Sequence, residues 1–135
     1  MNDTEFSPAS QNERLFLCAC MQDVHCLATF AGTVSADWFY DDRNRQLWTY
    51  LLERMREERD FDLAICMNAL KGRVESGYIA EVSIAVPTSA LADEYVAAIR
   101  VAYQTRQLLV LASALPRKVA TAQDALGYAQ RELER

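Results

Sequence analysis

Three of the four cysteines and the only histidine lie within ten residues, in the stretch LCACMQDVHC at positions 17–26. Cysteine and histidine side chains are the usual protein ligands of zinc. A cysteine beside a histidine is also the usual arrangement of a thiol nucleophile. The first question is therefore whether Cys18, Cys20, His25 and Cys26 form a metal site, a reactive thiol or the buried side of a helix.

The spacing of these residues favours the buried side of a helix. Structural zinc sites take their ligands from C-x2-4-C knuckles, or from residues four apart on a helix, and neither spacing occurs here. At about 100° per residue, one helix points Cys18 and His25 to nearly the same face and Cys20 about 160° away. His25 is also two turns from Cys18, among apolar neighbours. We therefore expect cysteines that pack as small hydrophobic residues, with no metal and no catalytic group.

The rest of the sequence has no enzyme motif either. It contains no G-x-x-x-x-G-K-[ST] phosphate loop, no G-x-S-x-G and no G-x-G-x-x-G, so we expect no bound cofactor. The formal net charge of −5 and the pI of about 4.9 repel phosphate, so we expect no direct nucleic-acid binding by this chain. These features predict a non-enzymatic interaction domain.

The N-terminal residues predict the compartment. The start, MNDTEFSPAS, is acidic and lacks the basic start followed by an apolar core that marks a signal peptide, so it is not one. No apolar run approaches the ~20 residues that span a bilayer. We expect a cytoplasmic protein without membrane contact, whose cysteines stay reduced. Residues 1–9 are expected to form a disordered leader.

Residues 10–88 are predicted to form a compact helical head. Only four glycines and three prolines interrupt the chain, which favours long helices. Ser10 and Glu13 form a capping box for a first helix that reaches about Phe30. Asp41 or Asp42 caps a second helix to about residue 59, and Asp62 caps a third that ends at Gly72. A short fourth helix covers about residues 78–85.

Residues 89–135 are predicted to form a helical hairpin that leads into a linker. A long helix begins at Ser89 and carries an apolar stripe. Pro116 breaks or kinks this helix, and AQDALGYAQRELER forms a last amphipathic segment. The predicted fold class is therefore all-α, with a compact multi-helix head followed by a C-terminal helical hairpin, in one domain overall.

The run LLVLASAL at positions 108–115 is apolar on every side of a helix. Such a surface must be covered, and we expect a second copy of the chain to cover it. Packing on the protein's own head is the alternative. The candidate oligomer interface consists of Tyr103, Leu108, Leu111 and Leu115. The aromatic residues 38–40 are expected to belong to the core rather than to a binding surface.

Five stretches of the chain, in order, resemble the N-terminal domain of the hexameric bacterial replicative DNA helicase, the DnaB type. The resemblance covers about residues 12–115. Its stretches are NERLFLCACMQD, ADWFYDDRNRQLW, DFDLAICMNAL, GYIAEV and AVPTSALADEYVAAIRVAYQTRQLL. The matching residues are Glu13, Leu17, Ala19, Asp23, Phe39, Tyr40, Arg45, Leu47, Trp48, Asp62, Leu63, Leu70, Val86, Pro87, Ser89, Tyr95, Arg100, Arg106 and Leu108.

The chain departs from this family at four positions. Cys18 and Asn44 stand where a glycine and a histidine are usual, Gly77 is a single glycine in place of a pair, and Leu91 replaces an asparagine. These departures indicate a divergent member, or a relative from a phage or a mobile element.

The resemblance implies a specific role. In this family the domain is non-catalytic, pairs through its helical hairpins, and forms a collar of three pairs on the hexamer. The collar docks the helical C-terminal domain of primase, or a helicase loader, during DNA replication. ATP and magnesium belong to a separate motor domain, which is not in this sequence. No direct nucleic-acid contact is implied.

Two other hypotheses stay open from the sequence. The chain is expected to be the collar domain alone, cut near the linker, but a stand-alone protein that binds or regulates a host helicase would have the same features. A small enzyme that uses Cys18 or Cys26 is the hypothesis from another class. Thiol-labelling rates distinguish it from an interaction domain, because a reactive thiolate is labelled fast in the native state.

Overall fold

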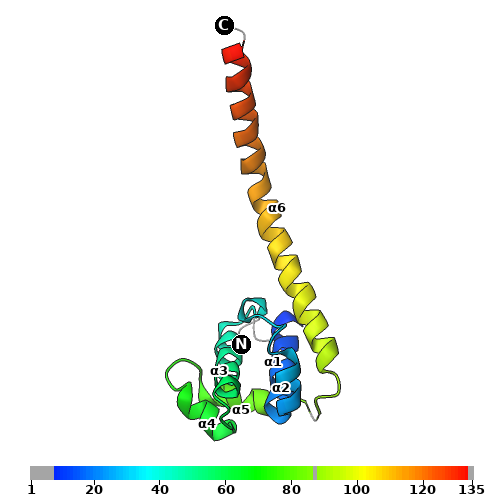
Figure 1. Cartoon of the computed structure of the whole chain (residues 1–135), viewed down its shortest axis with the longest axis vertical. Helices are drawn as coiled ribbons and strands as arrows, with labels where there is room; N and C mark the ends of the chain where they lie inside the picture. Colours follow the sequence, from blue (N-terminus) through cyan, green and yellow to red (C-terminus); the bar gives the residue numbers. More distant parts are fainter. Residues whose placement is uncertain (1–7, 87, 134–135) are drawn as a thin grey trace. The chain divides into compact units, whose positions relative to one another are not determined.

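The computed structural model describes residues 8–86 and 88–133, and within these ranges it contains helices, turns and no strand (Figure 1). The all-α prediction is confirmed. The predicted leader lies outside the described residues at positions 1–7, whereas residues 8 and 9 already belong to the first helix. The elements are α1 (Pro8–Gln22), α2 (Val24–Phe30), the 3-10 helix η2 (Ala36–Trp38), α3 (Asp42–Arg56), α4 (Leu63–Ala69), α5 (Ser76–Ser83) and α6 (Ala92–Leu133).

The chain divides into two compact units. The N-terminal unit runs to Tyr103 and the C-terminal unit begins at Gln104. Helix α6 belongs to both, because its first turns bury Ala92, Val96 and Ile99 in the core of the N-terminal unit. The N-terminal unit therefore includes residues beyond position 88, where the sequence places the end of the head.

Helix α1 is the central element of the N-terminal unit, where it contacts α2, α3 and α5. Its Phe16 is fully buried, and the ring centroid lies 5.2 Å from that of Trp48 and 5.5 Å from that of Phe30. Phe39 joins this aromatic cluster at 6.4 Å from Phe16. Offset and tilted rings at such distances are the favoured geometries of aromatic pairs. The cluster ties η2, α2 and α3 to the central helix.

The single helix predicted up to Phe30 is wrong, because it is interrupted at Asp23. Asp23 has an extended backbone and its carboxylate accepts the backbone N–H of His25, at 3.0 Å, as the N-cap of α2. Aspartate competes with helical hydrogen bonding in this way wherever a neighbouring contact favours the non-helical conformation. That contact is the hydroxyl of Ser89, which donates to the same carboxylate at 2.9 Å.

The starts of the next two helices agree with the sequence patterns. Asp41 is the N-cap of α3 and Asp62 is the N-cap of α4, each with its side chain accepting a backbone N–H of the first turn. Such caps satisfy donors that have no partner within the helix. Helix α3 ends at Arg56, three residues earlier than predicted. Gly72 has a φ of +87°, as expected for the turn that follows α4.

The predicted helical hairpin is wrong, because α6 is one continuous helix from Ala92 to Leu133 with Pro116 inside it. A proline costs about 3 kcal/mol in a helix interior, through one lost hydrogen bond and a clash with the preceding turn. The flanking residues are rich in alanine and leucine, the strongest helix formers, so hydrogen bonding resumes on both sides of Pro116.

The end of α3 predicts a stabilising substitution. Glu58 has a φ of 56° and closes a Schellman turn, in which Arg59 N–H donates to Arg54 O at 2.9 Å and Glu58 N–H to Met55 O at 3.1 Å. Glu58→Gly removes the strain of this left-handed conformation, and we expect it to raise the free energy of unfolding by about 0.5–1 kcal/mol. Urea unfolding followed by tryptophan fluorescence measures the change.

Glu57→Gly is the matched control for this substitution. Glu57 has a φ of −84°, so glycine only adds freedom to the unfolded chain there and we expect it to destabilise. Equal effects at the two positions would contradict the strain argument.

Candidate functional site

The four cysteines are all buried and unbridged. Cys18 Sγ lies against the chain before α6, where it accepts the backbone N–H of Val86 at 3.4 Å. Cys20 and Cys26 lie 3.9 Å apart between their sulfur atoms, because the extended backbone at Asp23 breaks the straight path from α1 to α2. One straight helix does not bring these two thiols together, so this pairing was not found from the sequence.

His25 is exposed at the start of α2. Among residues 8–86 and 88–133, no group of three or more His, Cys, Asp or Glu side chains is placed to hold a metal ion. Burial raises the pKa of Cys20 and of Cys26, and it raises the pKa of Cys66 to about 11. These thiols are therefore protonated at neutral pH, which is the opposite of what a nucleophile needs.

Thiol labelling tests this assignment. At pH 8 we expect the native chain to react with a disulfide reagent at least about 100-fold more slowly than the unfolded chain, since an accessible cysteine has a pKa of about 8.5. The same chain in guanidinium chloride is the control, where all four thiols should react. One thiol that reacts in the native chain at the rate of a free cysteine would support the enzyme hypothesis instead.

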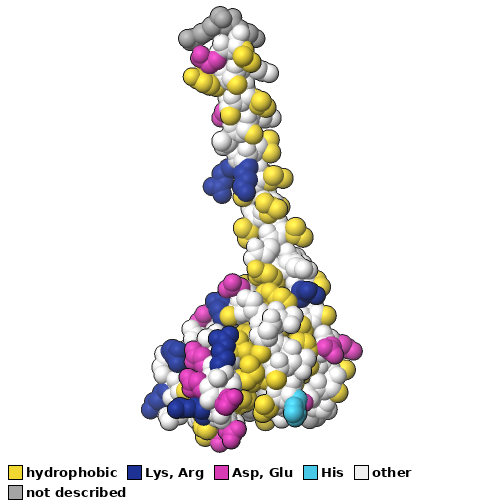
Figure 2. Space-filling view, viewed as in Figure 1, with side chains coloured by type: hydrophobic (Ala, Val, Ile, Leu, Met, Phe, Trp, Pro, Cys, Tyr) yellow, Lys and Arg dark blue, Asp and Glu magenta, His cyan; other side chains and the backbone are white. Residues whose placement is uncertain are grey.

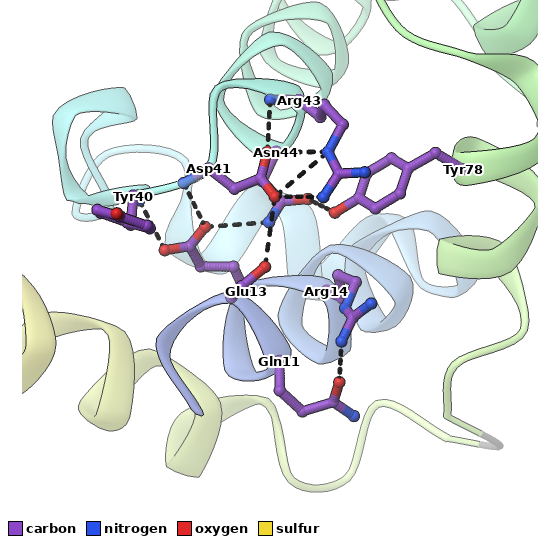
Figure 3. Close-up of polar contacts among 9 residues, drawn as sticks. Gln11, Glu13, Arg14, Tyr40, Asp41, Arg43, Asn44 and Tyr78 are labelled. Atoms are coloured by element: carbon purple, nitrogen blue, oxygen red, sulfur yellow. Dashed lines mark hydrogen bonds and ion pairs between the residues drawn. The ribbon is translucent and has the colours of Figure 1, made fainter. Parts of the chain in front are cut away.

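The one fully buried carboxylate described in the N-terminal unit is that of Glu13, which lies beyond the first turn of α1 (Figure 3). Helix α1 begins at Pro8, two residues before the predicted capping box, since proline suits a first helical turn. Glu13 instead accepts the backbone N–H of Tyr40 at 2.7 Å and of Asp41 at 3.2 Å, and the side-chain amide of Asn44 at 3.0 Å. A negative charge at the N-terminus of α3 is favoured by the helix dipole.

Asn44 extends this network to α5. The hydroxyl of Tyr78 donates to Asn44 Oδ1, and the guanidinium of Arg43 lies 3.9 Å above the centre of the Tyr78 ring (Figure 3). Arg43 also pairs with Asp41 at 2.6 Å. Burial raises the pKa of Asp41, but the hydrogen bonds and charge of Arg43 outweigh this effect and hold that pKa below its usual value. The network joins α1, α3 and α5, and its role is structural.

The aromatic residues 38–40 divide between core and surface. Phe39 is buried, Trp38 is half-buried and Tyr40 is exposed. Trp38 stacks on Tyr103, with ring centroids 6.2 Å apart and planes 23° apart, and the Arg100 guanidinium lies 5.7 Å from the centre of the Trp38 ring. The stack joins η2 to the last turn of α6 in the N-terminal unit. Tyr103 is therefore a packing residue of this unit, whatever else it contacts.

The other predicted interface residues are highly exposed. Leu108, Leu111 and Leu115 lie in the C-terminal unit with 65%, 50% and 52% of their surface accessible. Figure 2 shows hydrophobic side chains that continue along the helix beyond them. The exposed large apolar side chains beyond Leu115 include those of Val119, Leu126, Tyr128 and Leu133, which the candidate interface predicted from the sequence does not contain. A single soluble chain rarely exposes so many large apolar side chains without a partner.

A comparison with known protein families identifies the family of this chain. Residues 7–101 match the family described as the DnaB-like helicase N terminal domain. The chain belongs to this family. The match covers more than two thirds of its length, and no curated protein or solved structure matches the chain.

The region that matches this helicase domain family ends within two residues of the N-terminal unit, which runs to Tyr103. Several residues that carried the resemblance are core residues of the DnaB-like domain: Glu13, Leu17, Ala19, Phe39, Leu47, Trp48 and Leu70 are all buried. The described part of the chain also has no helix that is long and apolar enough to cross a membrane. The family resemblance proposed from the sequence is confirmed.

Proposed function

We propose that this chain acts as the non-catalytic N-terminal collar domain of a DnaB-type replicative DNA helicase. In this role it assembles with further copies of itself and docks the helical C-terminal domain of primase, or a helicase loader, during DNA replication. The family assignment supports the helicase role. ATP hydrolysis is the task of a separate motor domain, and this chain contributes contacts rather than chemistry.

The observation that carries the assembly step is the exposure of apolar side chains along the C-terminal unit. Eight large apolar residues between positions 108 and 133 are each at least 46% exposed, and a further exposed tyrosine lies among them. Burying each such side chain is worth about 1.5–3 kcal/mol. A second copy is a partner that is present whenever the protein is, and paired helices in closed assemblies bury such faces on both copies.

Solution mass tests the assembly step. We expect light scattering across a tenfold concentration range to give at least twice the chain mass of 15.3 kDa. Leu115→Glu places a charge on the apolar face, so we expect it to shift the protein to the monomer. Ser113→Glu adds the same charge at an exposed polar position of the same turns and should leave the mass unchanged. A wild-type monomer at every concentration would contradict the assembly step.

Titration with the helical C-terminal domain of the primase from the same source tests the docking step. We expect saturable binding by calorimetry, and we expect it with Leu115→Glu as well if docking uses the N-terminal unit. The absence of heat at micromolar concentrations, with a helicase loader as well as with primase, would contradict the docking step.

A further inference from the structure

Because α6 is unbroken, a heptad repeat runs through the whole C-terminal unit. From position 108, every position reached by alternating steps of four and three holds an apolar residue, over 26 residues. Such a pattern over nearly four heptads is typical of a helix that pairs with another helix. We call these residues the apolar seam: Leu108, Ala112, Leu115, Val119, Ala122, Leu126, Ala129 and Leu133. All eight are exposed in the single chain.

Residues that oppose helix pairing lie outside the seam. Pro116 follows a seam residue directly and falls on the flank. Arg117, Asp124 and Arg131 recur every seven residues on the face opposite the seam, where a paired helix remains in water. The seam itself therefore contains no charge and no proline.

The order of residues in the seam is almost the same when it is read backwards. Two copies that run in opposite directions, with a two-fold axis midway between positions 120 and 121, place each seam residue opposite another one. Leu108 then meets Leu133, Leu115 meets Leu126 and Val119 meets Ala122. Ala112 meets Ala129, so that small residues also face small ones. If the two copies shift by one heptad in one direction, two of the eight pairs of facing seam residues are lost. A shift in the other direction brings the hydroxyl of Thr105 into the seam.

The distribution of charge favours this direction over a parallel pair. Residues 1–103 contain 16 acidic and 9 basic side chains, a net charge of −7, whereas residues 104–135 contain 3 acidic and 5 basic ones, a net charge of +2. A parallel pair joins both acidic units to the same end of the paired helices. An antiparallel pair joins them to opposite ends of a seam about 38 Å long, far beyond the screening length of about 8 Å. Opposed helix dipoles add to this preference.

We propose that the apolar seam is the docking surface for the seam of a second copy, in the antiparallel register with its axis between positions 120 and 121. This inference rests on the assembly step of the proposed function, and adds to it the direction and the register of the pair. Each copy supplies the same surface, so the contact is closed and produces a dimer.

Disulfide cross-linking between two single-cysteine variants tests the direction and register. Ala112→Cys and Ala129→Cys are small changes at seam positions that face one another only in the proposed pair. A disulfide needs Cα atoms within about 7 Å, whereas position 112 lies about 26 Å from position 112 of the other copy in this register. One variant carries a mass tag, so that mixed and homogeneous dimers separate on a non-reducing gel. The four native cysteines are buried, and the wild-type chain is the control.

We expect a cross-linked dimer from the mixture and essentially none from either variant alone. Cross-links from each variant alone, without a mixed product, would overturn the proposal in favour of a parallel pair. A wild-type protein that is dimeric by light scattering but gives no seam cross-link overturns the register and leaves the assembly step intact. A monomeric wild-type protein would contradict both the register and the assembly step. If a chain with both substitutions then formed a disulfide within itself, the C-terminal unit would be a hairpin instead.

Discussion

Replacing Phe16 with alanine is expected to lower the free energy of unfolding of the N-terminal unit by about 3–5 kcal/mol. Phe16 is fully buried on the central helix and contacts three other aromatic rings, so its removal leaves a cavity that α1 cannot close by itself. Domains of this size are stable by only about 5–15 kcal/mol in total. Urea unfolding followed by circular dichroism measures the loss.

Two further substitutions serve as comparisons for Phe16→Ala. Phe16→Leu keeps most of the volume and should cost clearly less than alanine. Ile84→Ala removes an apolar side chain of which 80% is exposed, and should change stability by less than about 0.5 kcal/mol. Comparable losses at positions 16 and 84 would show that the aromatic cluster is not the core of this unit.

Replacing Glu13 with alanine is expected to cost a similar amount, about 3–5 kcal/mol, through a different mechanism, because it removes three hydrogen bonds to a charged group. The substitution leaves the backbone N–H groups of Tyr40 and Asp41 and the amide of Asn44 without their shared acceptor. Donors buried without a partner lose their hydration and regain nothing. The same urea titration measures the effect.

Glu13→Gln separates charge from shape in this network. Glutamine keeps one acceptor oxygen but presents its NH2 group to a donor, so we expect a loss of about 1–3 kcal/mol. Glu53→Ala, at an exposed position of α3, is the control and should be nearly neutral. If Glu13→Gln were as stable as the wild type, the two carboxylate oxygens of Glu13 would not both be needed as acceptors.

The stability of this domain and its assembly depend on different parts of the chain. The matched residues 7–101 coincide with the compact N-terminal unit, whereas the apolar seam lies beyond them. Stability of the unit and assembly through the seam should therefore respond to different substitutions. Phe16→Ala and Glu13→Ala report on the first property, and Leu115→Glu reports on the second.

The sequence alone determined the features that depend on local pattern. The 3.6-residue periodicity and the scarcity of glycine and proline predict the all-α class, and the aspartates at positions 41 and 62 mark the starts of α3 and α4. The apolar neighbours of the cysteines predict their burial. Ordered matches over most of the chain predict the DnaB family. These signals depend on residues close together in the sequence, so they can be recognised without a structure.

Only the tertiary structure decided where distant residues meet. Asp23 ends α1 because Ser89, 66 residues later, supports its non-helical conformation. Glu13 accepts the backbone N–H groups of residues 40 and 41, just before α3, because the packing of α1 on α3 buries it beside residues 40, 41 and 44. Pro116 predicts a turn from its local cost, but the helix continues because its strong helix-forming flanks resume the hydrogen bonding. That continuity alone joins the two halves of the seam into one surface.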